Sequence, residues 1–99
     1  MNENKTAQIK NIVAKIDIGK ITNYPEHPQS KTLRRIVSYS KRVLDSSNEK
    51  EIFRLSTDLA YYLDAIVNKS GYVKDEAEKK HWLEISRELF ENTIGVKEK

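Results

Sequence analysis

The side chains best suited to chemistry in this 99-residue chain are its two histidines, His27 and His81. Glu78 and His81 form a Glu-x-x-His unit, the spacing by which di-iron helical bundles place two metal ligands on one helix face. Such a site needs a second copy of the unit, but the residue three positions before His27 is Tyr24. The sequence therefore predicts no metal site, and it places Glu78 and His81 at the solvent-exposed start of a helix.

No other group of residues has the pattern of a catalytic site. The chain has no cysteine, which excludes a disulfide scaffold, thiolate metal sites and thiol nucleophiles. Its three glycines are far apart, so the sequence contains no glycine-rich phosphate-binding loop. The serines fall at predicted helix caps, at core-facing positions or on a polar face. We therefore expect no enzyme activity, no cofactor and no small-molecule substrate.

Hydrophobic periodicity predicts four helices that would position these residues. Glycine and proline are scarce, whereas lysine, glutamate, isoleucine and leucine are abundant, which favours helix over sheet. The clearest pattern has spacings of 3-4-3-4 and consists of Ile52, Leu55, Leu59, Tyr62 and Ile66. The predicted helices cover about residues 6–18, 30–46, 49–69 and 75–93. Because their connections are short, we expect an all-α, antiparallel up-down four-helix bundle that forms a single domain over residues 1–99.

Several residues predict where the helices begin and end. Asn48 with Glu51, and Asp75 with Glu78, have the spacing of a capping box, in which a side chain accepts from backbone N–H groups of the first turn. Two glycines are expected to end helices in the left-handed conformation: Gly19 and Gly71.

Charged residues interrupt the apolar positions of the N-terminal segment. Lys5, Lys10 and Lys15 leave no apolar run long enough for a signal peptide or a membrane span. The sequence therefore predicts a cytoplasmic protein without a membrane-spanning helix.

Positive charge is concentrated in the first half of the chain. Residues 1–50 carry ten Lys and Arg against five Asp and Glu, whereas residues 51–99 carry eight against ten. The predicted second helix has a basic face opposite its apolar one, made of Lys31, Arg34, Arg35, Lys41 and Arg42. This face could meet nucleic acid, anionic lipid or an acidic protein patch, or it could only keep the helix solvated. The uneven charge weakens the case for general nucleic-acid binding, in which many phosphates are neutralised at once.

Tyrosines mark two further surface positions. Tyr61 falls in the middle of the polar arc of the predicted third helix, where the core does not account for an aromatic ring, and tyrosine is enriched at interfaces. In the turn that follows this helix, Lys69 and Lys74 flank Tyr72 and Val73. Tyr72 and Val73 either close the end of the bundle or form a recognition tip.

The C-terminal part of the chain resembles a known family. Its leucine-rich third helix contains Ala-Tyr-Tyr-Leu and is followed by Asn68-Lys69 and an acidic helix start, and the last helix is rich in Leu and Ile and ends at Gly95. These features, between Leu55 and Val96, are similar to those of immunity proteins against pediocin-like (class IIa) bacteriocins, of the enterocin A immunity type. The length, the basic character and the lack of cysteine agree with this family as well.

The resemblance implies a cytoplasmic bundle that protects a bacteriocin-producing cell. Members of the family are thought to act from inside the membrane on the mannose phosphotransferase permease once bacteriocin has engaged it, and not to bind free bacteriocin strongly. Specificity in the family lies largely in the C-terminal half, which implies a partner-binding set in this chain: Lys69, Tyr72, Lys74, Arg87 and Asn92. The basic second helix would favour contact with the negatively charged inner membrane surface.

Two other function classes stay open at the level of the sequence. The basic face of the second helix would suit a nucleic-acid-binding regulator, whose binding weakens steeply with salt. A small helical bundle would also suit an adaptor or a dimerising protein, which would form a concentration-dependent oligomer.

Overall fold

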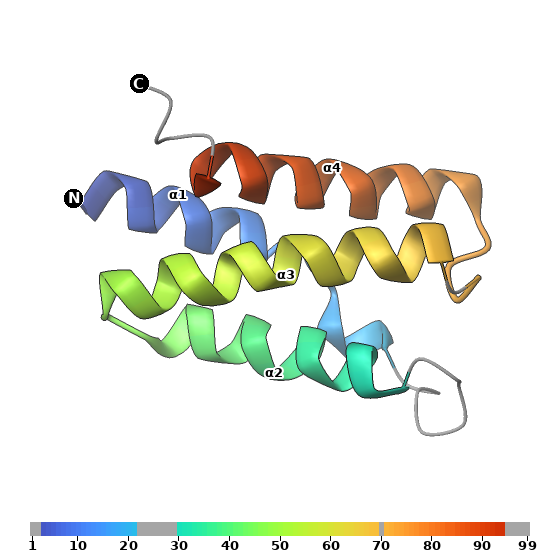
Figure 1. Cartoon of the computed structure of the whole chain (residues 1–99), viewed down its shortest axis with the longest axis horizontal. Coiled ribbons are helices and arrows are strands. Elements are labelled where there is room, and N and C mark those ends of the chain that lie inside the picture. The colour runs from blue at the N-terminus through green and yellow to red at the C-terminus, as the bar shows by residue number, and fades with distance from the viewer. Residues whose placement is uncertain (1–2, 22–29, 70, 95–99) are drawn as a thin grey trace.

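The computed structural model describes residues 3–21, 30–69 and 71–94 of the chain. Its elements are, in order, α1 (Glu3–Val13), a short 3-10 helix η1 (Ile18–Lys20), α2 (Ser30–Asp45), α3 (Glu49–Lys69) and α4 (Glu76–Asn92). No strand occurs in the described residues. Figure 1 shows α1 and α3 running in one direction and α2 and α4 in the other. The predicted all-α, antiparallel four-helix bundle is therefore confirmed.

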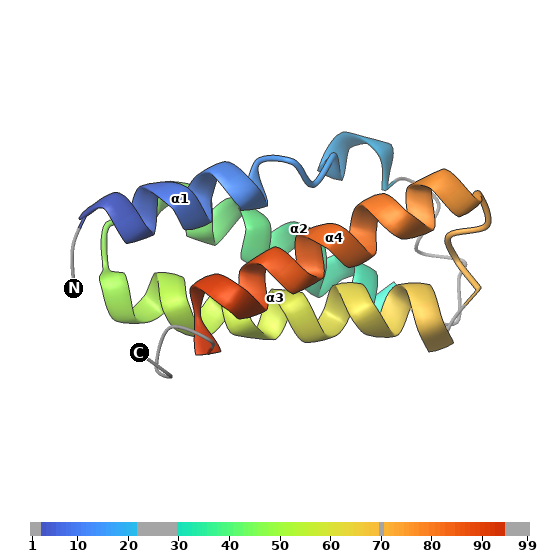
Figure 2. The same cartoon turned by 90° about the horizontal axis from the view of Figure 1, so that it is seen from above.

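Helix α3 lies at the centre of the bundle. It packs against α1, α2 and α4, and Figure 1 shows α2 and α4 on its opposite flanks. Helix α1 covers one half of the length of α3, and the segment after α1 leads to η1, which contacts α2 (Figure 2). Because α3 has neighbours on three sides, about half of its circumference must be apolar, and residues outside the predicted 3-4-3-4 stripe, Leu63 and Val67 among them, are buried as well.

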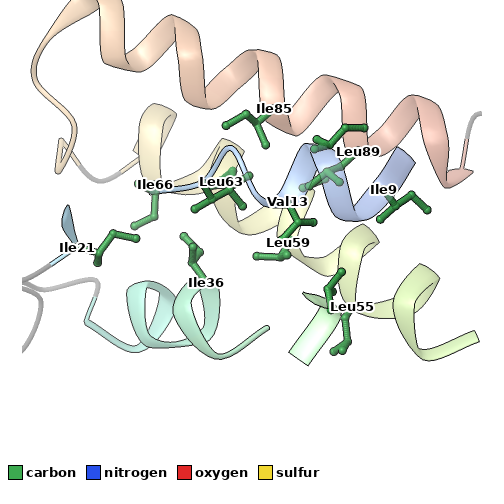
Figure 3. Packing of buried hydrophobic residues seen from close by; sticks show 14 of the residues in the cluster. Ile9, Val13, Ile21, Ile36, Leu55, Leu59, Leu63, Ile66, Ile85 and Leu89 are labelled. Carbon is green, nitrogen blue, oxygen red and sulfur yellow. The ribbon is translucent and has the colours of Figure 1, made fainter. Parts of the chain in front are cut away.

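The apolar faces of the four helices meet in one shared core (Figure 3). The large side chains with no exposed surface are Ile9, Leu33, Ile36, Val43, Leu55, Leu59, Leu63, Ile66 and Leu89. Burial of one such side chain stabilises the fold by about 1.5–3 kcal/mol. Since these residues occupy the interior, the groups available for contact with other molecules lie on the outside of the bundle.

The first helix differs from its prediction at both ends. Helix α1 begins at Glu3, about three residues early, and ends at Val13, about five residues before its expected end. The chain then continues in tighter turns, in which the N–H of Ile16 donates to the carbonyl oxygen of Val13 over 3.0 Å. These turns and η1 place Ile16 and Ile21 in the core, where each is only 6% exposed.

Packing explains the early end of α1. A continued helix would place Ile18 on the side opposite Ile9, away from the core, because the two residues are nine positions apart at about 100° each. The tighter turn instead lets Ile18 pack against the core cluster. Gly19 consequently lies inside η1 and not in the left-handed conformation, so its predicted role as a helix cap is wrong.

Local sequence signals set the ends of the other helices. The Oδ1 atom of Asn48 accepts from the N–H of Glu51 and the Oδ2 atom of Asp75 accepts from the N–H of Glu78, each over 3.0 Å. Gly71 follows α3 with a φ of 74°, the left-handed conformation expected of it. Helices α3 and α4 consequently begin within one residue of the predicted positions, and the bounds of α2 agree with the prediction equally well.

The turn between α2 and α3 is tied by a small polar network. The backbone N–H of Asn48 donates to Ser46 Oγ over 3.0 Å, and the Ser46 hydroxyl donates to Glu51 Oε1 over 2.8 Å. The other carboxylate oxygen of Glu51 accepts from Arg42 Nη2 over 3.1 Å. The Ser46 hydrogen bond, followed by that of Arg42, holds the pKa of Glu51 below its usual value. The ionised form of Glu51 is therefore the one that this turn stabilises.

A Glu51→Gln substitution is expected to destabilise the protein more at neutral pH than in acid. A carboxyl group whose pKa is lowered by folding adds stability above its unfolded-state pKa, and the protein loses that stability as the pH falls through the lowered value. Urea unfolding of both proteins between pH 7 and pH 3 measures the difference. Glu91→Gln is the matched control, because Glu91 Oε2 lies 3.8 Å from Arg87 Nε in an exposed pair. The assigned role of Glu51 would be contradicted if the unfolding free energies of the variant and the natural protein differed by the same amount at every pH in this range.

Small side chains let α4 approach α3 closely. Ser86 is 4% exposed, and its hydroxyl donates to the carbonyl oxygen of Ala60 over 2.7 Å. Ser56 is also fully buried in this part of α3. The close approach fixes how the outer side chains of the two helices meet, and it places Tyr61 of α3 beside Phe90 of α4.

Candidate interaction surfaces

The edge between α3 and α4 carries the most exposed aromatic ring among the described residues. Tyr61 is 57% exposed, and its ring meets the ring of Phe90 edge-on, with centroids 4.8 Å apart and planes at 86°. Offset and edge-on ring pairs are the favourable geometries for aromatic contacts. Tyr61 is thus held at one edge by α4 and presents the rest of its ring to solvent.

Residues of α4 and of the segment that follows it extend this aromatic pair into a larger surface. Leu83, Arg87 and Phe90 follow one another at spacings of four and three, which places them on one side of α4, and Ile94 comes two residues after the helix ends. Leu83 and Phe90 are half-buried, and Ile94 is 40% exposed. We call Tyr61 and these four residues the Tyr61 face.

An open groove adjoins the Tyr61 face, between the C-terminal half of α3 and the N-terminal half of α4. Its volume is about 760 Å³. Its lining consists of Val67, Asn68, Glu76, Lys79, Lys80, Leu83, Glu84 and Arg87. Both signs of charge surround the apolar side chains, and Lys79 pairs with Glu76 over 3.3 Å. Such a mixed lining suits the surface of another protein better than a polyanion.

The turn between α3 and α4 has one buried and one exposed part. Val73 is 3% exposed, and the ring of Tyr72 packs against Trp82 with centroids 6.4 Å apart. Burial, and after it the charge of Glu78, raises the pKa of Tyr72, so its hydroxyl stays neutral at physiological pH. Tyr72 and Val73 therefore close the end of the bundle, whereas Lys69 and Lys74 are exposed on its surface.

Arg87 and Asn92 lie on different sides of α4. Arg87 belongs to the Tyr61 face and forms a long, exposed pair with Glu91. Asn92 is half-buried, and its Oδ1 accepts from Lys5 Nζ over 3.1 Å while its Nδ2 donates to the carbonyl oxygen of Glu88 over 2.8 Å. The oxygen of the Asn92 amide thus joins α4 to α1, and its nitrogen bonds within α4. The structure does not bring Asn92 together with Arg87.

Helix α2 presents the expected basic face, and its five basic residues are all exposed. Two of them stack on tyrosines: the guanidinium of Arg35 lies 5.8 Å from the ring centre of Tyr62, and that of Arg42 lies 5.7 Å from that of Tyr39. The two tyrosine rings are themselves 5.8 Å apart. Arg35, Tyr62, Tyr39 and Arg42 therefore form a continuous row across α2 and α3, which we call the Arg–Tyr row.

Sequence reasoning missed the tyrosines of this row. The periodicity of α3 predicts Tyr62 on its apolar face, whereas the structure has it half-buried at the border of that face. Tyr39 lies four residues after Arg35 and three before Arg42, the spacing at which side chains on a helix are neighbours. This spacing is the feature of the sequence that indicates contacts between the Tyr39 ring and neighbouring arginines.

Comparisons with protein-family models, curated proteins and solved structures found no match to this chain.

The described residues offer no site for a metal ion. They contain no group of three or more His, Cys, Asp and Glu side chains close enough to bind one. Glu78 and His81 are both exposed, and His81 Nε2 lies 3.4 Å from the carbonyl oxygen of Lys15. His27 and Tyr24 lie outside the described residues.

None of the described helices combines the length and the apolar content that crossing a bilayer requires.

Proposed function

We propose that this protein is an immunity protein that protects a bacteriocin-producing cell from a pediocin-like (class IIa) bacteriocin. It would act in the cytoplasm, on the mannose phosphotransferase permease with bacteriocin bound. Two findings support the proposal: the resemblance of residues 55–96 to that family, and the presence of the Tyr61 face within the same segment. The observation that carries it is Tyr61, an aromatic ring 57% exposed and fixed in place by Phe90.

The Tyr61 face has the composition of a protein-binding site. Tyr and Arg are over-represented among the residues that dominate binding energies, and such residues are surrounded by side chains that exclude water. Here Tyr61 and Arg87 are of the types that dominate binding energies. The surrounding side chains that would exclude water are Leu83, Phe90 and Ile94. The exposed Lys69, at the end of α3, and the exposed Lys74, in the turn that follows, add positive charge for a partner.

A surface without a catalytic pocket can still stop pore opening. A protein that binds the closed permease–bacteriocin complex more tightly than the open one shifts the equilibrium toward the closed state. Moving that equilibrium from 1:99 to 99:1 requires about 10⁴-fold tighter binding to the closed state. A single well-packed interface supplies a difference of this size when its central residues are lost on opening.

Expression of the chain in a bacteriocin-sensitive strain tests the proposal. Cells that carry the gene are expected to survive at least one member of a panel of class IIa bacteriocins at concentrations that kill cells with the empty vector. A tagged chain is expected to co-purify with the permease from membranes of cells treated with that bacteriocin, and not from untreated cells. Unchanged killing by every member of the panel, together with no capture of the permease, would refute the proposal.

A further inference from the structure

We propose that the outer face of α2, together with the Arg–Tyr row at its border with α3, binds the surface of an anionic lipid bilayer. This inference goes beyond the immunity function and does not depend on it, because it uses a different face of the bundle.

The charge of α2 is the first observation. Of its sixteen residues, five are basic and only Asp45 is acidic. The five basic side chains are exposed along a helix that is about 24 Å long. Among the described residues, Lys31, Arg35 and Lys41 take part in no ion pair, whereas Arg42 is paired with Glu51. Most of the positive charge on this face is thus available to an anionic partner.

The Arg–Tyr row is the second observation. Tyrosine combines an apolar ring with a polar hydroxyl, and it is enriched at the headgroup level of membranes. Arg35 Nη1 lies 3.5 Å from the Tyr62 hydroxyl, in addition to its contact with the ring. Stacking on the tyrosines limits the motion of the two guanidinium groups before a lipid phosphate is bound. Arginine also matches phosphate geometry with two parallel hydrogen bonds.

The layout of this face favours a bilayer over nucleic acid. Its five basic residues are exposed on the outer side of α2, and none of them lines the groove between α3 and α4. Proteins that bind single strands use exposed aromatic faces on which bases stack, but the rings of Tyr39 and Tyr62 already contact Arg42 and Arg35. A flat, anionic layer requires only a one-sided basic surface, which is what α2 offers.

This mode of binding would leave the Tyr61 face available. Helices α2 and α4 lie on opposite flanks of α3 (Figure 1), so a molecule that rests on a membrane through α2 turns α4 away from the lipid. The α3–α4 groove, lined in part by Leu83 and Arg87, would then remain open to a protein partner.

Sedimentation of the full chain with lipid vesicles tests the proposal. We expect at least tenfold tighter binding to vesicles of equal parts phosphatidylglycerol and phosphatidylcholine than to pure phosphatidylcholine, and weaker binding at 300 mM than at 50 mM salt. Each basic residue near such a surface is worth about fivefold in affinity, so the triple variant Lys31→Gln, Arg35→Gln, Lys41→Gln is expected to bind roughly 100-fold more weakly.

The control removes the same number of charges elsewhere. The triple variant Lys74→Gln, Lys80→Gln, Arg87→Gln alters exposed residues of the α4 side and is expected to bind vesicles within about threefold of the natural chain. Equal losses in the two variants would show an effect of net charge alone and overturn the proposal. Equal affinity for the two lipid mixtures would also overturn it, as would tighter binding to duplex DNA or RNA in a gel shift at the same salt.

Discussion

A Leu59→Ala substitution is expected to lower the free energy of unfolding by about 2–5 kcal/mol, because it leaves a cavity at the centre of the bundle. Leu59 has no exposed surface and lies near the middle of α3, the helix that packs against all the others. A domain of this size has only about 5–15 kcal/mol of stability in total. The midpoint of thermal unfolding, followed by circular dichroism, should fall by about 10–30 °C.

Leu44→Ala is the matched control for this prediction. The chemical change is the same, but Leu44 is 39% exposed on α2 and can be removed without leaving an enclosed cavity. Its expected cost is less than about 1 kcal/mol. Similar losses of unfolding free energy in the Leu59 and Leu44 variants would mean that α3 is not the centre of the core.

The starts of α3 and α4 and the end of α3 could be predicted from the sequence because local interactions determine them. Capping by Asn48 and Asp75 involves residues three positions away, and a glycine after α3 needs no distant partner. The end of α1 could not be predicted in this way. It depends on where Ile18 and Ile21 pack against other helices, and residues distant in sequence decide that packing.

The same distinction applies to the surfaces. The exposure of Tyr61 follows from its place in the polar arc of α3, which the sequence shows directly. The contact of Tyr61 with Phe90 depends on the orientation of α4 about its axis relative to α3. The hydrogen bond between Lys5 and the Asn92 amide forms only because α1 packs beside α4. Periodicity predicts which side of one helix faces outward, but it carries no information about which side chain of another helix lies next to it.

A Tyr61→Ala substitution is expected to abolish most of the protection that the chain confers. Truncation of a central aromatic residue at a protein interface costs about 2–4 kcal/mol, which corresponds to roughly 30- to 1000-fold in affinity. The measurement is the bacteriocin concentration that halves the growth of cells expressing each variant at equal protein levels. The fold should survive, because Tyr61 is mostly exposed and its removal sacrifices only an edge contact worth about 1 kcal/mol.

Comparison with Tyr61→Phe separates recognition from stability. The phenylalanine keeps the ring and its contact with Phe90 and loses only the hydroxyl, so protection should stay within a few-fold of the natural chain if the ring is the anchor. A loss of protection in the alanine variant alone, with both variants folded by circular dichroism, would place the partner on the Tyr61 face. Full protection by a folded alanine variant would instead move the partner away from α3, because no other described ring on this helix is as exposed.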